Sequence, residues 1–277
     1  MLAIQSYHFF DFDRLNNFQK NIPDNAIKFA EISCPLLNKH GYETILYTSS
    51  KYIDLFRHIG YKEIILLDEE YLKLFPNDFW SIAKLISIRS IREPFIHCDL
   101  DLFLIKDISD NIKNANFFAF HPEKWVEQKL FYEHASFLST FFPDINKSEF
   151  MSYNLGLFGG QNFQSINKAS NSVLNFFINH EKKIDNELKK IKYYDKIDSW
   201  YKSVFLEQFL MVSLILFDNN MLKPEFVFTS ETMNSTAQDM KNYNIIHLWT
   251  DIYGNVQKYI GIDNFLKMIQ HTYLIEK

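Results

Sequence analysis

The feature that most constrains the fold is a regular alternation of strand-type and helix-type segments through the first part of the chain. Strand-type segments lie at residues 3–9, 43–50, 62–68 and 94–104. Segments with helical periodicity lie between them, at residues 25–42, 51–61 and 78–91, and glycines close the first two. Such a β-α-β-α-β-α-β order is typical of a mostly parallel sheet covered by helices. We therefore expect an α/β protein whose ligands bind beyond the carboxyl ends of its strands.

The second part of the chain continues this pattern with longer helices. It contains strand candidates at residues 113–120, 153–160 and 243–251, and helical segments at residues 165–192 and 199–217. There is no internal repeat, no low-complexity linker and no hinge rich in proline or glycine. We expect one domain over residues 1–277, with a first half at about 1–125 and a second half at about 126–277.

Composition and charge argue against two classes of function. Hydrophobic residues make up 47% of the chain, which is ample for a core, and the formal net charge of -5 gives no basic footprint for nucleic acid. The longest apolar run, Phe209–Phe217, falls short of the roughly 20 residues that span a bilayer, so any membrane association is expected to be peripheral. The first residues lack the features of a signal peptide, which predicts a cytoplasmic protein.

Two aspartates lie in the otherwise apolar segment FIHCDLDLFLIKDI, residues 95–108. Alternation along a strand would point Asp99 and Asp101 to one side, so that both carboxylates emerge together where the strand ends. Unpaired, the two would repel each other, and burial would raise the pKa of at least one. A divalent cation removes this difficulty, because carboxylate oxygens suit Mg²⁺ or Mn²⁺ and the ion keeps positions open for substrate phosphates. The sequence therefore predicts a Mn²⁺ or Mg²⁺ site at this segment.

This segment resembles the D-x-D motif of nucleotide-sugar-dependent glycosyltransferases of the GT-A fold. The preceding FWSIAKLISI is similar to the helix that carries a lysine or arginine before the motif in that superfamily. The later segment YNLGLFGG resembles the N-x-G-x-F-G-G segment of the family. The segment LEQFLM resembles the start of the family's helix with an acidic residue before glutamine, and IIHLWTD resembles the segment with its late metal-binding histidine. These segments occur in the same order as in the family, over roughly residues 3 to 258. The chain most resembles small bacterial GT-A enzymes.

The resemblance implies a metal centre and a catalytic acid. Asp101 and His247 would bind the Mn²⁺ or Mg²⁺ ion, and Asp99 would contact the ion or the ribose of the donor. When bound, the ion would act as a Lewis acid on the leaving nucleoside diphosphate. Catalytic roles fall to Asp101 and to Glu207, which could stabilise a developing positive charge or accept the proton of the acceptor hydroxyl.

The resemblance also implies residues that bind the nucleotide-sugar. Tyr7 would stack on the base, Lys84 and Lys258 would reach the diphosphate, and Asn154 and Gly156 would shape the pocket for the sugar or acceptor. The family pattern often has an acidic residue after the second strand where this chain has serines, and it has a tighter Gly-Lys spacing before the position of Lys258.

The fold and function implied are those of a GT-A-like, Rossmann-like glycosyltransferase with a mixed, mostly parallel sheet. Residues 1–125 would be the nucleotide-sugar-binding half, and residues 126–277 the acceptor half. The expected reaction is metal-dependent transfer of a sugar from a nucleotide-diphosphate donor, a UDP-sugar in the first instance, to a hydroxyl of a glycan or glycoconjugate. The expected setting is bacterial surface polysaccharide synthesis. Retention and inversion of the anomeric configuration are both compatible with the sequence.

Each residue also has a plainer interpretation, and for Asp99 and Asp101 it is a surface loop just past a strand. His247 has apolar neighbours and would serve as a hydrogen-bonded core histidine. Lys84 would lie on the solvated face of an amphipathic helix, and Glu207 would be a favourable carboxylate at a helix N-terminus. Gly159 and Gly160 would form a turn.

Two other functions compete with the glycosyltransferase. A phosphotransferase or phosphatase of the haloacid-dehalogenase kind also uses a strand followed by D-x-D, but it places the motif near the N-terminus and follows it with Thr or Val. The chain has Phe103 after Leu102 and a long upstream segment, which disfavours that class. A non-catalytic module that binds a nucleotide or a sugar is the other alternative, and it would bind its ligand without turnover.

Overall fold

The described residues of this computed structural model form a seven-stranded sheet in the order β10-β6-β9-β4-β1-β2-β3. The structure describes residues 1–8, 22–76, 79, 81–122, 133–190, 200–220, 224–227, 245–248 and 261–274. The strands are β1 Leu2–Tyr7, β2 Glu43–Thr48, β3 Glu63–Leu66, β4 Phe95–Cys98, β6 Phe118–Ala119, β9 Leu157–Gly160 and β10 Glu225–Phe226. Strands β4, β1, β2 and β3 are parallel, and β9 lies antiparallel between β4 and β6. The predicted α/β class with a mostly parallel sheet is confirmed.

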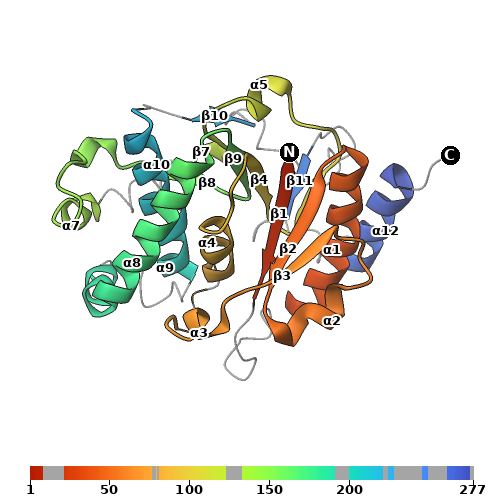
Figure 1. The fold of residues 1–277 in the computed structure, drawn as a ribbon, viewed down its shortest axis with the longest axis horizontal. Helices are drawn as coiled ribbons and strands as arrows, with labels where there is room; N and C mark the ends of the chain where they lie inside the picture. The colour runs from red at the N-terminus through yellow and green to blue at the C-terminus, as the bar shows by residue number, and fades with distance from the viewer. Residues whose placement is uncertain are drawn as a thin grey trace.

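Helices cover both faces of this sheet (Figure 1). One face carries α1 Ile22–Lys39, α2 Ile53–Phe56 and α12 Ile262–Tyr273, and the other carries α4 Ile82–Ile88, α8 Phe163–Leu188 and α10 Val212–Asp218. Directly before α10, the helical run begins as α9, Trp200–Val204, and continues through a π-helical segment, η6, at Phe205–Met211. Shorter helical turns are η3 Ser50–Tyr52, α3 Glu69–Leu72, α5 Asp110–Lys113, α7 Ala135–Leu138 and η4 Lys147–Glu149.

Local sequence explains where several of these elements begin and end. Helix α1 ends before Gly41, whose positive φ of 80° is costly for residues with a Cβ. Helix α3 begins after Asp68, whose side chain accepts a hydrogen bond from the backbone N–H of Tyr71. In β1, neighbouring residues pack to opposite sides, with Ala3 and Ile4 in different apolar clusters. The central strands are therefore buried on both faces, as expected where helices cover a parallel sheet on both sides.

The predicted single strand at residues 94–104 is wrong. The chain leaves β4 after Cys98, turns through Asp99–Asp101, and enters β5 at Leu102–Leu104 in a different, two-stranded sheet. A hydrogen bond of 3.1 Å from the backbone N–H of Leu102 to the carbonyl of Asp99 closes this turn. A continuous strand would have carried both carboxylates through the interior, whereas the turn leaves them partly exposed.

Gly159 and Gly160 lie inside β9 and do not form a turn. A Cβ on Gly159 would fall 2.1 Å from the carbonyl oxygen of Phe95, and one on Gly160 would fall 2.2 Å from that of Asn116. The glycine pair therefore lets β9 approach neighbouring backbone on both sides.

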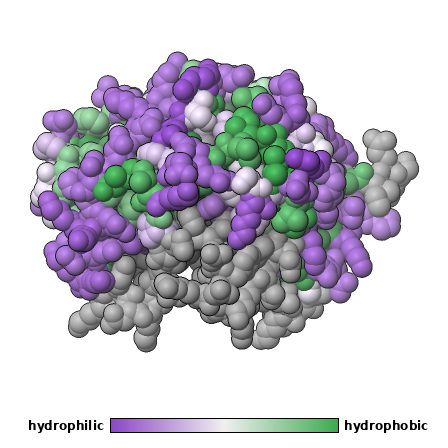
Figure 2. Space-filling model, turned by 60° about the horizontal axis from the view of Figure 1, so that its bottom comes forward, coloured by the Kyte–Doolittle hydropathy of each residue, from purple (hydrophilic) through white to green (hydrophobic). Residues whose placement is uncertain are grey.

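Two further pairs of strands are antiparallel and complete the described sheets. Strand β5 pairs with β11, Ile245–His247, and β7, His121–Pro122, pairs with β8, Tyr153–Asn154. Among the described residues, no helix combines the length and the apolar character needed to cross a membrane. Where Figure 2 colours the surface, hydrophilic residues predominate around separate apolar patches.

Candidate metal centre

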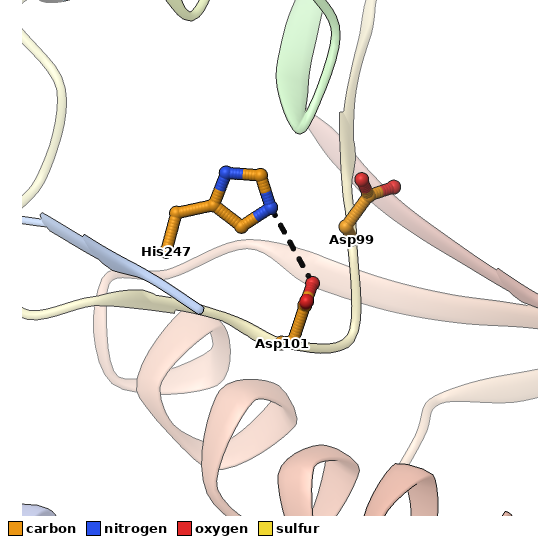
Figure 3. Close-up of side chains that lie close together, drawn as sticks. All are labelled: Asp99, Asp101 and His247. Carbon is orange, nitrogen blue, oxygen red and sulfur yellow. Dashed lines mark ion pairs between the residues drawn. The ribbon is translucent and has the colours of Figure 1, made fainter. Parts of the chain in front are cut away.

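Asp99, Asp101 and His247 lie together at the carboxyl end of β4 (Figure 3). One ligand atom from each side chain can be chosen so that all three lie within 4.8 Å of one another. The Nε2 atom of His247 lies 3.5 Å from Oδ1 of Asp101. The two carboxylates are partly exposed and the imidazole is buried. The sequence had assigned these three residues to one metal site, and the structure brings them together.

The pairing of two short strands brings His247 to the aspartates. In the register of β5 with β11, His247 lies opposite Leu102, the residue that follows Asp101. The backbone N–H of Leu248 donates a hydrogen bond of 3.0 Å to the carbonyl of Asp101, which extends the pairing to the end of the turn. Apolar contacts with α1 and α12 hold this small sheet in place, because Phe103 and Ile246 belong to one buried cluster with residues of both helices.

Hydrogen bonds link Asn154 and Gly156 to Asp99. The backbone N–H of Asp99 donates a hydrogen bond of 2.8 Å to the carbonyl of Gly156, whose own N–H donates to Oδ1 of Asn154 at 2.9 Å. A Cβ on Gly156 would fall 2.4 Å from Cε1 of His247. The glycine therefore makes room for the imidazole of His247, and its predicted part in a sugar or acceptor pocket stays a prediction.

Lys84 is buried rather than solvated, so the predicted solvated helix face is wrong. Every residue of α4 is buried, because α8 packs over it. The Nζ atom of Lys84 lies 2.8 Å from Oδ1 of Asp99 and 2.6 Å from Oε1 of Glu207. Burial alone would lower the pKa of Lys84, but the attraction of the two carboxylates outweighs it and raises this pKa. The lysine therefore carries its charge inside the protein.

Glu207 is wholly buried in the π-helical segment η6. This segment lies between α9 and α10 in one helical run, so the carboxylate does not cap a helix N-terminus, and that interpretation is wrong. Burial raises the pKa of Glu207 to about 7, although Lys84 opposes the rise. Burial likewise raises the pKa of Asp99, again against the effect of Lys84. Single-turn π-helical insertions of this kind are frequent at functional sites.

His97 is a further residue near the cluster, and the sequence analysis did not assign it a role. It is buried in β4, its Nε2 lies 3.0 Å from Oγ of Ser6, and its Nδ1 lies 3.8 Å from Oδ1 of Asp99. Burial, with a contribution from Lys84, lowers the pKa of His97 well below its usual range, so the ring is neutral near pH 7. Strand alternation could have found it, since positions 97 and 99 point the same way.

Two further nucleotide contacts were predicted, at Tyr7 and at Lys258. Tyr7 ends β1 and is buried, with its ring in an edge contact with Tyr52 at a centroid distance of 5.0 Å and beside Phe56. Lys258 lies outside the described residues.

The donor set fits the divalent cation that the sequence predicts. Two carboxylates supply hard oxygen ligands, and the imidazole supplies one nitrogen. Asp99 and Asp101 can carry two negative charges, and Lys84 beside Asp99 supplies one positive charge. The remaining negative charge favours binding of a divalent cation.

Comparison with known proteins adds one match. Residues 25–273, which include Lys84, Asp99, Asp101, Glu207 and His247, match a family described as a family of unknown function (DUF6734). A search of curated proteins found no match.

Proposed function

This chain belongs to the DUF6734 family of unknown function, and we propose that it is a metal-dependent glycosyltransferase of the GT-A type. The observation that carries this proposal is the cluster of Asp99, Asp101 and His247 at the carboxyl end of a parallel strand. The donor would be a nucleotide-diphosphate sugar, with a UDP-sugar as the first candidate. The acceptor would be a hydroxyl of a glycan or glycoconjugate, in the setting of bacterial surface polysaccharide synthesis.

The position of the cluster supports this proposal. Ligands of parallel α/β sheets bind beyond the carboxyl ends of the strands, where β4 delivers Asp99 and the turn delivers Asp101. Histidine at the end of β11 completes a set with two carboxylates, which agrees with the motif order read from the sequence. The partly exposed aspartates leave the set open to a ligand from solvent.

Each residue of the candidate site would have its own role. Asp99, Asp101 and His247 would hold a Mn²⁺ or Mg²⁺ ion, and Gly156 would keep the space that the imidazole occupies. When bound, the ion supplies Lewis-acid stabilisation of the charge that develops on the leaving diphosphate. The buried surroundings of Lys84 and Glu207 strengthen the electrostatic interactions on the inner side of the site.

Thermal-shift measurements with nucleotides test the proposal. The parent chain would be heated with UDP, GDP, CDP and their sugars, each with and without Mn²⁺. We expect stabilisation by one family of diphosphates only when Mn²⁺ is present. Asp101→Ala should abolish this shift and leave the fold intact, because it removes a partly exposed ligand and no core volume. The control is Asp54→Ala, an exposed aspartate of α2.

An equal Mn²⁺-dependent shift in parent and Asp101→Ala would contradict the proposed site. Donor turnover separates an enzyme from a binding module, so release of the nucleoside diphosphate should follow incubation with the donor identified by the shift. Metal-dependent binding without any release would favour the non-catalytic alternative.

A further inference from the structure

Lys84 uses all of its hydrogen-bond donors inside the protein. An ammonium group has three N–H donors and no acceptor. The Nζ atom lies within hydrogen-bond distance of three acceptors: Oε1 of Glu207 at 2.6 Å, Oδ1 of Asp99 at 2.8 Å and the carbonyl of Leu155 at 3.1 Å. The side chain is only 5% exposed. No donor therefore remains for a diphosphate unless one of these contacts breaks.

The lysine contact also occupies one of the two carboxylate oxygens of Asp99. Oδ1 is the atom held by Lys84, and the same oxygen lies 3.8 Å from Nδ1 of His97. The backbone of Asp99 is held as well, through its bond to Gly156. Oδ2 is thus the oxygen that Asp99 can offer to a cation without giving up its contact with Lys84.

Glu207 competes with Asp99 for the charge of this lysine. Its carboxylate is wholly buried, Oε1 is bound to Lys84, and Oε2 has no hydrogen-bond partner within the described residues. One ammonium charge is therefore shared between two carboxylates. Glu207 is the closer partner, and its attraction to the ammonium weakens the interaction of Lys84 with Asp99.

We propose that Lys84 and Glu207 are positioning residues for Asp99, in which the lysine fixes one carboxylate oxygen and Glu207 limits how strongly the lysine competes with a cation for that carboxylate. This inference rests on the metal site of the proposed function. It replaces the predicted contact of Lys84 with the diphosphate and the predicted catalytic role of Glu207. Both residues then act on the cation through Asp99 and touch neither substrate.

A double-mutant cycle on Mn²⁺ affinity tests this proposal without any substrate. The dissociation constant would be measured from the signal of free Mn²⁺ in electron paramagnetic resonance. We expect Glu207→Gln to weaken Mn²⁺ binding about fivefold, because the full charge of Lys84 then falls on Asp99. In the Lys84→Met background the same change should have less than about a twofold effect, since the residue through which Glu207 acts is gone.

Further variants guard against a general loss of structure. Lys84→Gln keeps N–H donors without the charge and takes the place of Lys84→Met in the cycle if that variant does not fold. Asp185→Asn breaks the ion pair of Asp185 with another buried lysine, Lys202, at 2.7 Å, and should lower the melting temperature without changing Mn²⁺ affinity. At saturating Mn²⁺, Lys84→Gln should bind nucleoside diphosphate within about twofold of the parent.

The outcomes separate this inference from the proposed function. A parent chain that takes up no Mn²⁺ overturns both. If the parent binds Mn²⁺ and Glu207→Gln still lowers Mn²⁺ affinity after Lys84 is removed, only the coupling through the lysine is overturned. A large loss of diphosphate affinity in Lys84→Gln at saturating Mn²⁺ would show that Lys84 contacts the phosphates, and it would overturn the positioning role alone.

Discussion

Gly156 lies directly against the imidazole ring of His247, so closely that a Cβ on the glycine would fall 2.4 Å from Cε1 and 2.8 Å from Nδ1. Gly156→Ala must therefore displace the ring from its present position beside Asp101. We expect Mn²⁺ affinity to fall at least about tenfold, a loss comparable to that caused by disturbing the support of a metal ligand. Calorimetric titration of Mn²⁺ would measure it.

Gly60→Ala is the matched control for this change. Gly60 has a positive φ of 89°, and a Cβ there would meet nothing within 4 Å, so alanine strains the backbone without touching the site. Stability should fall by about 1 kcal/mol while Mn²⁺ affinity stays unchanged. Equal Mn²⁺ affinity in Gly156→Ala and the parent would mean that the ring position does not matter for the ion.

Replacing the imidazole itself should have a similar effect on the ion. His247→Asn removes the nitrogen nearest Asp101 while keeping a polar side chain, and we expect Mn²⁺ binding to weaken at least about tenfold. His58→Asn is the control, because His58 is exposed and its Nε2 lies 3.1 Å from Oε1 of Glu31, an exposed residue of α1. Undiminished Mn²⁺ binding by His247→Asn would remove the histidine from the ligand set.

Gly159→Ala should destabilise the sheet more than any change at the metal site. The new Cβ would meet the backbone of Phe95 and Ile96, which cannot rotate away as a side chain could. We expect a loss of about 3 kcal/mol or more in the free energy of unfolding, measured in urea. Gly41→Ala, where a Cβ meets nothing within 4 Å, should cost about 1 kcal/mol, and a similar loss in both variants would contradict the close approach of β9 to β4.

The raised pKa of Glu207 predicts a pH-dependent difference in stability. Because burial raises this pKa from 4.5 to about 7, the folded state binds the proton more tightly than the unfolded state. The stability contributed by this group is fully present below the unfolded value and is lost as the pH rises through about 7. Relative to Glu207→Gln, the parent should lose about 3 kcal/mol between about pH 5 and about pH 8.

Urea unfolding of both proteins across that range would measure the difference. The metal must be absent in these measurements, because an ion bound at Asp99 changes the charge near Lys84. A constant difference between the two proteins over the whole range would show that the carboxyl of Glu207 titrates alike in the folded and unfolded states.

Several elements were predictable because their signals are local. The first helix and its end before Gly41 follow from apolar spacing and one glycine, and the parallel strands follow from the order of segments. The division of residues 94–104 into β4 and β5 was missed, because apolar residues on both sides of the aspartates favour a strand at each position. The burial of α4 had a signal in its apolar residues on every side, which the lysine at position 84 obscured.

The sequence by itself determined the α/β class and the residues that could bind a cation, because both depend on periodicity and on the chemistry of neighbouring side chains. Only the tertiary structure decided that Lys84 lies between Asp99 and Glu207, and that Gly156 makes room for His247. These contacts join residues from separate strands and helices, and their geometry depends on how the helices pack on the sheet. Burial then sets the charge of each group, since it depends on everything that surrounds the group after folding.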